Sequence, residues 1–548
     1  MPSYLKRYCA VQAYDSYTAQ DHAVWRHALQ QLTSYLAEHA VAIYPRGLVA
    51  TGITLEKIPR IEDIDACMGK FGWGAVAVEG FIPPKTFLEF QALRVLPIAA
   101  DIRRFAHLTY TPAPDIIHEA AGHAPIIADE TYAEYLTRYA ELAQKAIFSS
   151  ADIRLYEAIR YLSDIKEMRG VSTEDIAIAQ QRLDAVVTTK TEASEAARVA
   201  RLYWWTAEYG LVGDLNNPKI YGAGLLSSVL ECRTSLAPTT KKLPLSLQAL
   251  DTAYDITEPQ PQLFVAQDFA HLHATLATVE TTMSFRNGGE EGLRRAKIAA
   301  TVNTCELDSG LQVSAQITDY EQSDGSWLVN FAGACQFAWR GQELIGHGCR
   351  QHPDGYMLLI GKLKDTPKCS WQLTADDLAQ LGLHVGAWAE ISLAGGYQVH
   401  GVLVRWYRHD GRLLYLTWAD GKITKDAKLI QPFKQYDMVL GTQVTSVFGG
   451  PAAREEFGEY PIGEASTKPR GAVAYTDKEK SLYDLYARVA AWRASQYSPQ
   501  PQEFTELIAT IERQFSDQWL LAAELLELVA PTTSSTIVGA LRKIANAG

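Results

Sequence analysis

Apolar residues in the first half of the chain recur at steps of three and four. In DHAVWRHALQQLTSYLAEH, Trp25, Leu29, Leu32 and Leu36 fall on one side of a helical wheel, which predicts an amphipathic helix. The same spacing runs through PDIIHEAAGHAP, ETYAEYLTRYAELAQKAIF and VARLYWWTAEYGL. We therefore predict a mainly α structure from about residue 21 to about residue 270.

The period changes to two between about residues 296 and 446. LQVSAQITDY and SWLVNFAGA flank Asp324-Gly325, and VLVRWYRH and RLLYLTW flank Asp410-Gly411. Asp-Gly between alternating apolar runs is a strong hairpin signal, because both residues tolerate the positive φ of a tight turn. This region is predicted to be an antiparallel β domain.

Gly, Pro and charged residues dominate 449–472, which is typical of a linker. Helical spacing returns after Thr476-Asp477-Lys478-Glu479, a capping box. The 548 residues exceed the roughly 250–300 that one hydrophobic core supports, so several folding units are expected. We predict a multidomain protein with these parts: a mainly α domain at 1–285 with a helical insertion at about 150–195, a β-rich domain at 290–448, a linker at 449–472 and a helical region at 473–548.

The formal net charge is −12, which disfavours nonspecific binding to nucleic acid or to an anionic membrane. The seven cysteines show no CxxC spacing and no disulfide framework. There is no signal-peptide core and no apolar run of membrane-spanning length. We expect a cytoplasmic protein that acts on small molecules.

The sharpest local feature is DIIHEAAGHAP, in which His118 and His123 lie five positions apart. On an ideal α-helix five residues separate side chains by about 140°, too far for one metal ion. The two imidazoles can share a metal only if the helix is distorted or ends there, and we expect Gly122 and Pro125 to end it.

Glu208, among the aromatic residues of YWWTAEYG, is the best candidate for a third ligand. An unpaired carboxylate is costly to bury in such surroundings, and a bound cation would explain it. Two histidines and one carboxylate leave coordination positions open, which suits Fe(II) and O₂ chemistry. On spacing alone, however, ordinary helix histidines and a solvated glutamate are the commoner outcome.

Three blocks in order, TYTPAPDIIHEAAGHAPIIAD, YWWTAEYGL and IYGAGLLSSVLE, resemble the pterin-dependent aromatic amino-acid hydroxylases, in particular bacterial phenylalanine 4-hydroxylases. The resemblance covers about residues 21–270. It implies the hydroxylase fold for this part, with His118, His123 and Glu208 as iron ligands. The implied cofactors are Fe(II) and tetrahydrobiopterin or a related reduced pterin, with O₂ as co-substrate.

The resemblance also implies roles for the surrounding residues. Asp115 and Ser227 fall where the family orients the first histidine, and Arg103 falls on the arginine that binds the substrate carboxylate. The remaining matched positions are Gly80, Ile82, Phe87 and Glu119 for the pterin, Thr111 and Ser227 for the amino-acid backbone, and Pro114, Trp204 and Tyr209 for the aromatic ring. Read without the family, each of these is an ordinary core, cap or surface residue.

The expected reaction is hydroxylation of a free aromatic amino acid, most simply L-phenylalanine to L-tyrosine. Pro97 resembles the bacterial phenylalanine enzymes, whereas Ile256, where tyrosine preference is associated with an aspartate, also resembles tryptophan enzymes. Tryptophan hydroxylation is therefore a second hypothesis. Two more are a metal-dependent hydrolase with Glu119 as base, and a catalytically silent homologue whose β domain serves binding or assembly.

The chain departs from the family in three respects. A helical insertion separates His123 from Glu208 and could pack outside the site or cover it. No amino-acid-sensing domain precedes the catalytic part, and the usual short tetramerisation tail is replaced by the β domain and helices, which could mediate a homo-oligomer. In that region His347, Cys349 and His352 in GHGCRQH are interpreted as strand and turn residues, because three ligands without a fourth nearby make a weak metal motif.

Overall fold

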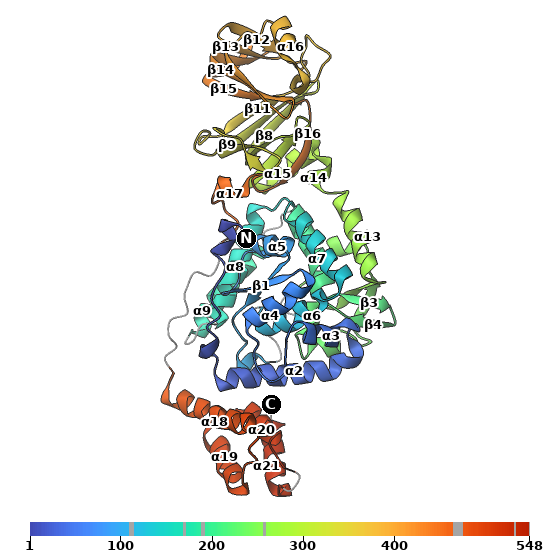
Figure 1. Cartoon of the computed structure of the whole chain (residues 1–548), viewed down its shortest axis with the longest axis vertical. Helices are drawn as coiled ribbons and strands as arrows, with labels where there is room; N and C mark the ends of the chain where they lie inside the picture. The colour runs from blue at the N-terminus through green and yellow to red at the C-terminus, as the bar shows by residue number, and fades with distance from the viewer. Residues whose placement is uncertain are drawn as a thin grey trace.

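The computed structural model describes residues 1–108, 114–167, 171–187, 192–255, 259–463, 475–530 and 533–546. The molecule is elongated, with a helical part in the middle, a β part at one end and the C-terminal helices at the other (Figure 1). We call these the central, β and C-terminal parts.

The central part is helical, with two small sheets. Its strands are β1 (Gly74–Val78) and β2 (Val95–Ala99), which pair in parallel, and β3 (Leu211–Asp214), β4 (Asn217–Ile220), β5 (Lys241–Pro244) and β6 (Gln262–Ala266), which form a sheet in the order β4-β3-β6-β5. Its α-helices are α1 (Ser3–Lys6), α2 (Ala19–His39), α3 (Ile43–Ala50), α4 (Ile61–Met68), α5 (Pro84–Ala92), α6 (Ala124–Ile127), α7 (Glu130–Ala143), α8 (Ser150–Glu167), α9 (Thr173–Val187), α10 (Glu195–Tyr203), α11 (Ala223–Leu226), α12 (Glu231–Thr234) and α13 (Phe269–Glu280). Short 3₁₀ turns are η1 (Tyr14–Ser16), η2 (Gly69–Phe71), η3 (Phe105–His107) and η6 (Leu247–Leu250), and two π-helical turns are η4 (Ile117–His123) and η5 (Trp204–Glu208).

A large apolar core lies in the central part, with smaller clusters beside it. The predicted stripe on α2 is buried there, since Trp25, Leu29, Leu32 and Leu36 are fully inaccessible to solvent. A threonine-led capping box, Thr18 with Asp21, starts this helix by satisfying free amides of its first turn. The same cluster contains residues of α3, α4, α7 and both sheets, and with them residues of η4 and η5.

The β part consists of two sheets whose strand pairs are all antiparallel. One runs β10-β9-β8-β7-β16 with β11 also on β9, and the other runs β12-β13-β14-β15. The strands are β7 (Val302–Leu307), β8 (Leu311–Ser323), β9 (Ser326–Trp339), β10 (Gln342–Glu343), β11 (Tyr356–Ile360), β12 (Trp388–Ser392), β13 (Tyr397–His409), β14 (Arg412–Lys425), β15 (Lys428–Val439) and β16 (Val444–Gly449), accompanied by α14 (Ser284–Asn287), α15 (Gly289–Ala299), α16 (Ala375–Gln380) and η7 (Ser370–Gln372).

Both predicted Asp-Gly hairpins are confirmed. Asp324-Gly325 joins β8 to β9 and Asp410-Gly411 joins β13 to β14, and all four residues have φ between 43° and 75°. Positive φ at two consecutive turn residues matches the twist of the flanking strands. The local sequence was therefore enough to predict these two turns.

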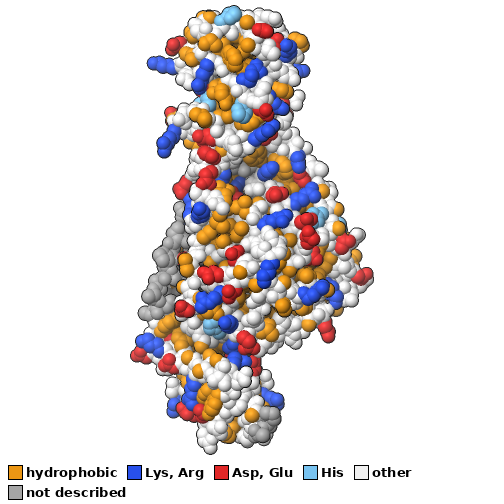
Figure 2. Space-filling model, in the orientation of Figure 1, with side chains coloured by type: hydrophobic (Ala, Val, Ile, Leu, Met, Phe, Trp, Pro, Cys, Tyr) orange, Lys and Arg blue, Asp and Glu red, His pale blue; other side chains and the backbone are white. Residues whose placement is uncertain are grey.

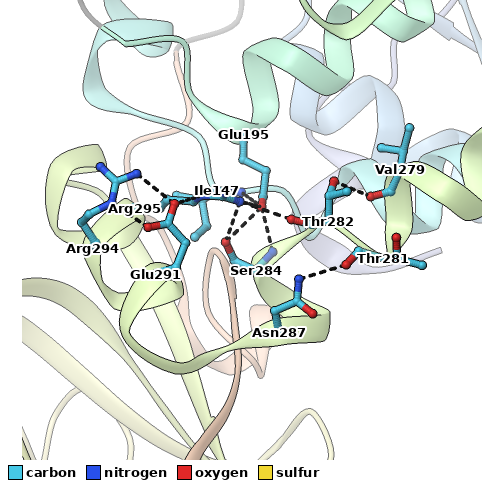
Figure 3. A network of polar contacts seen from close by, with 10 residues as sticks. All are labelled: Ile147, Glu195, Val279, Thr281, Thr282, Ser284, Asn287, Glu291, Arg294 and Arg295. Carbon is cyan, nitrogen blue, oxygen red and sulfur yellow. Dashed lines mark hydrogen bonds and ion pairs between the residues drawn. The ribbon is translucent and has the colours of Figure 1, made fainter. Parts of the chain in front are cut away.

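The joint between the central and β parts is built around the buried carboxylate of Glu195 (Figure 3). It accepts hydrogen bonds from the Ile147 amide at 3.1 Å, from the Ser284 amide at 2.8 Å and from the Arg295 guanidinium at 2.9 Å. Ile147 and Glu195 belong to the central part, whereas Ser284 and Arg295 lie on α14 and α15. One charge thus ties the start of α10 to the helices that lead into the β part.

After β16 the chain returns to the central part. Lys85 on α5 donates to the carbonyl oxygens of Gln144 at 2.9 Å and Gly449 at 3.1 Å, and burial lowers the pKa of Lys85 to about 8. Arg454 in α17 (Arg454–Phe457) lies over the rings of Tyr4 and Tyr460. The first residues of the segment predicted as a linker, up to 463, are therefore packed against α5 and the N-terminus.

The C-terminal part contains α18 (Asp477–Ala494), α19 (Pro501–Gln514), α20 (Trp519–Leu526) and α21 (Ser535–Ala545), and the predicted Thr476 and Glu479 capping box is confirmed. These helices share an apolar cluster with Ala23, Val24 and Leu108 of the central part. Beside it Arg26 of α2 donates to both carboxylate oxygens of Glu524 at 3.1 and 3.0 Å, and both side chains are buried.

None of the helices in the described residues combines the length and apolar character needed to cross a bilayer. On the face shown in Figure 2, basic, acidic and apolar side chains are interspersed over all three parts.

We expect Glu524→Ala to destabilise the docking of the C-terminal helices by roughly 3–5 kcal/mol, because it removes the buried carboxylate that pairs with both Arg26 and Arg493. Hydrogen exchange of amides in α20 and α21 measures this change. The control is Glu506→Ala, which removes an exposed partner of Arg488 and should cost less than about 1 kcal/mol. Equal protection in the two variants would contradict the assignment of Glu524 as the docking contact.

Candidate metal centre

His118 and His123 lie at the second and last positions of η4, which is a π-helix. A π-helix closes its hydrogen bonds from residue i to i+5, so side chains five residues apart face the same direction. The two rings are 5.0 Å apart and nearly perpendicular. The sequence predicted that the helix ends near Pro125, and this prediction is wrong. The chain continues into α6, which has Pro125 in its first turn. Widening of the helix brings the two imidazoles together.

Glu208 closes the site from η5, which is also a π-helix. Its Oε2 lies 3.3 Å from His118 Nε2 and its Oε1 lies 3.1 Å from His123 Nε2. The side chain of His123 is fully buried, whereas 14% of His118 and 13% of Glu208 are exposed. The three donor groups therefore converge on one point that is largely shielded from solvent.

The charges of this cluster favour a cation at its centre. Burial by itself lowers the pKa of His118, but the Glu208 carboxylate outweighs it and raises that pKa to about 9. Burial raises the pKa of Glu208, yet the two histidines together hold it well below its ordinary value. Glu208 is thus ionised at neutral pH, and a divalent ion bound by all three residues would balance its charge.

Ser227 fixes the ring of His118. Its Oγ lies 3.1 Å from His118 Nδ1 and donates to the Ala223 carbonyl at 2.7 Å, so it accepts the Nδ1 proton. Nε2 is therefore the ring nitrogen that faces Glu208, and a metal ion bound there would replace its proton. The turn that carries Ser227 can approach because Gly222 lacks a side chain: a Cβ there would lie 2.4 Å from the Glu208 carbonyl oxygen.

Asp115 and Arg103 form a buried pair next to the cluster. Asp115 accepts from Nε and from a terminal nitrogen of Arg103, both at 2.8 Å, and from the backbone amide of His118 at 3.0 Å. Asp115 therefore orients His118 through its backbone, not through its ring. The other terminal nitrogen of Arg103 donates to the Ser227 carbonyl at 3.2 Å.

The comparisons with known proteins agree with this centre. The family model of the biopterin-dependent aromatic amino acid hydroxylases matches residues 8–147 and 172–287. These residues form a domain of that family. The central part is accordingly an enzyme domain of a biopterin-dependent family.

Several relatives of the domain are bacterial. The phenylalanine-4-hydroxylase of Chromobacterium violaceum is 28% identical over 265 residues, 48% of this chain and 74% of the relative. That of Pseudomonas aeruginosa is 29% identical over 258 residues, 47% of this chain and 81% of the relative. A structure of the Chromobacterium violaceum enzyme with iron(III) and 7,8-dihydrobiopterin is 24% identical, covers 52% of this chain and 92% of that chain, and has a TM-score of 0.39.

Two of the residues expected to hold the pterin, Phe87 and Glu119, lie beside the candidate metal ligand His123. Phe87 on α5 has its ring centre 6.3 Å from that of His123. Gly80 has a φ of 60°, a conformation that favours glycine, and Ile82 is buried two residues later. Glu119 lies 4.0 Å from His123 Nε2, and its buried Oε2 has no hydrogen-bond partner among the described residues. A buried acceptor without a hydrogen-bond partner fits a ligand that carries N–H groups, as a pterin does.

Tyr254 lies beside the residues expected to hold the aromatic ring, and the sequence did not indicate it. Trp204 stacks on Tyr209, and its nearer stacking partner is Tyr254, at 4.2 Å between ring centres. The hydroxyl of Tyr209 donates to Glu231.

Pro114 is exposed, and Thr111 and Ile256 lie outside the described residues. Tyr254 has no local signal, because only the fold brings it beside Trp204.

The helical insertion contacts the expected pterin loop. On α8 the Tyr156 hydroxyl donates to the Phe81 carbonyl at 2.9 Å, and the two rings stack with centres 5.6 Å apart. Residues 148–171, which include α8, are the gap between the two matched segments of the family model. The insertion thus supports the loop between Gly80 and Ile82 from outside.

We expect Ser227→Ala to weaken divalent metal binding about 10- to 100-fold, because the His118 ring loses the acceptor that sets its tautomer. Titration of metal-free protein with Fe(II) or Co(II) under anaerobic conditions measures the affinity. Ser228→Ala is the control, since its hydroxyl accepts from the Glu231 amide instead. Equal affinities for all three proteins would show that Ser227 does not orient the ligand.

Tyr156→Phe should raise the KM for tetrahydropterin about 3- to 10-fold with little change in kcat, because one hydrogen bond to the pterin loop is worth roughly 1 kcal/mol. Steady-state kinetics at varied pterin concentration separates the two constants. Tyr161→Phe, a more exposed tyrosine on the same helix, serves as the control. An unchanged KM in Tyr156→Phe would mean that α8 does not influence the loop.

Proposed function

We propose that this chain hydroxylates the ring of a free aromatic amino acid, converting L-phenylalanine to L-tyrosine with O₂, a reduced pterin and Fe(II). The observation that carries the proposal is the convergence of the donor atoms of His118, His123 and Glu208 within 4.8 Å of one another. Two imidazoles and one carboxylate are a ligand set that would suit Fe(II) and O₂ chemistry. Bacterial relatives named phenylalanine-4-hydroxylase support the choice of substrate.

Bound iron and reduced pterin supply the oxidising chemistry, and the residues of the chain hold and orient the reactants. His118 and His123 bind as neutral imidazoles, the first held by Ser227, and Glu208 contributes the negative charge. Glu119 offers an unpaired carboxylate oxygen to the N–H groups of the pterin. Phe87 offers a ring face within reach of the same centre.

Trp204 and Arg103 are the residues that we assign to substrate binding. Trp204, stacked between Tyr209 and Tyr254, gives an apolar wall that holds an aromatic ring without offering it a charged group. Arg103 is held by Asp115, and its remaining N–H groups are the cationic donors we assign to the substrate carboxylate. Together they recognise the two ends of an aromatic amino acid.

Glu208→Ala should lower tyrosine formation from phenylalanine at least about 100-fold, because the carboxylate is a metal ligand and not only a support for one. The assay uses Fe(II)-loaded full-length protein with tetrahydropterin and O₂, and offers tryptophan in parallel. Glu134→Ala, an exposed position on α7, is the matched control.

Product from tryptophan in preference to phenylalanine would overturn the substrate assignment and leave the reaction class standing. Absence of any hydroxylated product from iron-loaded, folded protein would overturn the proposed function itself.

A further inference from the structure

A second cluster of metal-binding side chains lies in the β part. His347, His352 and Asp437 each place one donor atom within 4.8 Å of the others. His347 is 1% exposed and Asp437 5% exposed, so two of the three side chains are buried. We propose that these three residues, with water as a fourth ligand, bind a zinc ion that joins the two β-sheets.

The distances suit one ion. His347 Nδ1 lies 3.1 Å from His352 Nε2 and 4.0 Å from Asp437 Oδ2. Bonds of about 2.0–2.1 Å in a tetrahedron separate neighbouring donor atoms by about 3.3 Å, which falls between the two observed distances. His352 is only partly buried, which leaves a side from which water can complete the coordination.

The two histidines are held by backbone hydrogen bonds. Their loop, 344–355, lies against β9, where the Phe337 amide donates to the His347 carbonyl and the Cys335 amide donates to the His352 carbonyl, both at 2.8 Å. The Phe337 ring stacks on both imidazoles, with centres 5.1 and 4.6 Å away. The positions of the rings are therefore set before any ion binds, which lowers the cost of binding.

Asp437 comes from the other sheet and lacks a basic partner. It lies on β15 opposite Thr417 of β14, whose hydroxyl donates to Asp437 Oδ1 at 2.5 Å. Within the described residues no lysine or arginine lies within ion-pair distance of it, and its other donor is the Gln435 amide at 3.3 Å. A buried carboxylate with only neutral donors is costly, and a bound cation removes that cost.

The donor set favours zinc over calcium or magnesium. Calcium and magnesium prefer oxygen ligands, whereas two imidazoles and one carboxylate are typical zinc ligands. The hydroxyl of Thr417 supplies the outer hydrogen bond that commonly orients a ligating carboxylate. Because the histidines follow β10 and the aspartate lies on β15, the ion would join two sheets that share no strand.

The experiment separates this site from the catalytic centre. Full-length protein is stripped of metal, dialysed against Zn²⁺, and its zinc content is measured by mass spectrometry. The wild-type chain should bind two ions. His118→Ala with Glu208→Ala removes catalytic donors and should leave one ion per chain. Addition of His352→Ala or Asp437→Asn to that background should remove the remaining ion, and addition of the exposed His384→Ala should not.

Two further readouts do not depend on how well the last variants fold. Co²⁺ bound to the chain that lacks the catalytic donors should give the visible absorption bands of a tetrahedral site, and Zn²⁺ should raise the Tm of that chain. Less than about 0.1 zinc per chain in that background, or zinc retained after His352→Ala, would overturn the proposal. The first result would mean that His347 and His352 share only a hydrogen bond, and the second that zinc binds elsewhere.

Discussion

The central part depends on one electrostatic constraint, the ionised carboxylate of Glu208 facing two imidazoles in a nearly closed space. Burial disfavours the charged form of each of these side chains. The cluster is favourable only because the Glu208 oxygens lie 3.1 and 3.3 Å from the imidazole nitrogens. Two π-helical turns make this meeting geometrically possible. Each turn gives up regular α-helical hydrogen bonding, a cost that the surrounding core must offset.

Close backbone packing supports the same constraint. Gly122 and Gly222 leave no room for a Cβ, because atoms of Ala223 and Glu208 occupy the space. These approaches bring Ser227 to the His118 ring, and Asp115 then holds the amide at the start of the same π-helix. A metal ligand, its orienting hydroxyl and a buried ion pair are thus parts of one packed unit.

The β and C-terminal parts are joined to this unit by buried charged groups. Glu195 gathers donors from both sides of the joint with the β part, Lys85 holds the chain as it returns, and Arg26 pairs with Glu524 under the C-terminal helices. Buried charges tolerate little displacement, because each loses its partner when the surfaces separate. The parts are therefore specified relative to each other.

Local sequence signals were enough to predict several elements and the three residues that converge at the candidate metal centre. The stripe on α2, the two Asp-Gly hairpins and the Thr476 capping box follow from periodicity and turn chemistry, which act over a few residues. Three ordered blocks of sequence indicated the family and with it His118, His123 and Glu208. Tertiary packing was needed to show how histidines five residues apart face one point, because α and π geometry differ by a local change in hydrogen bonding that packing selects. The same packing places Tyr254, Tyr156 and Asp437, since contacts between residues distant in the chain leave no pattern in the local sequence.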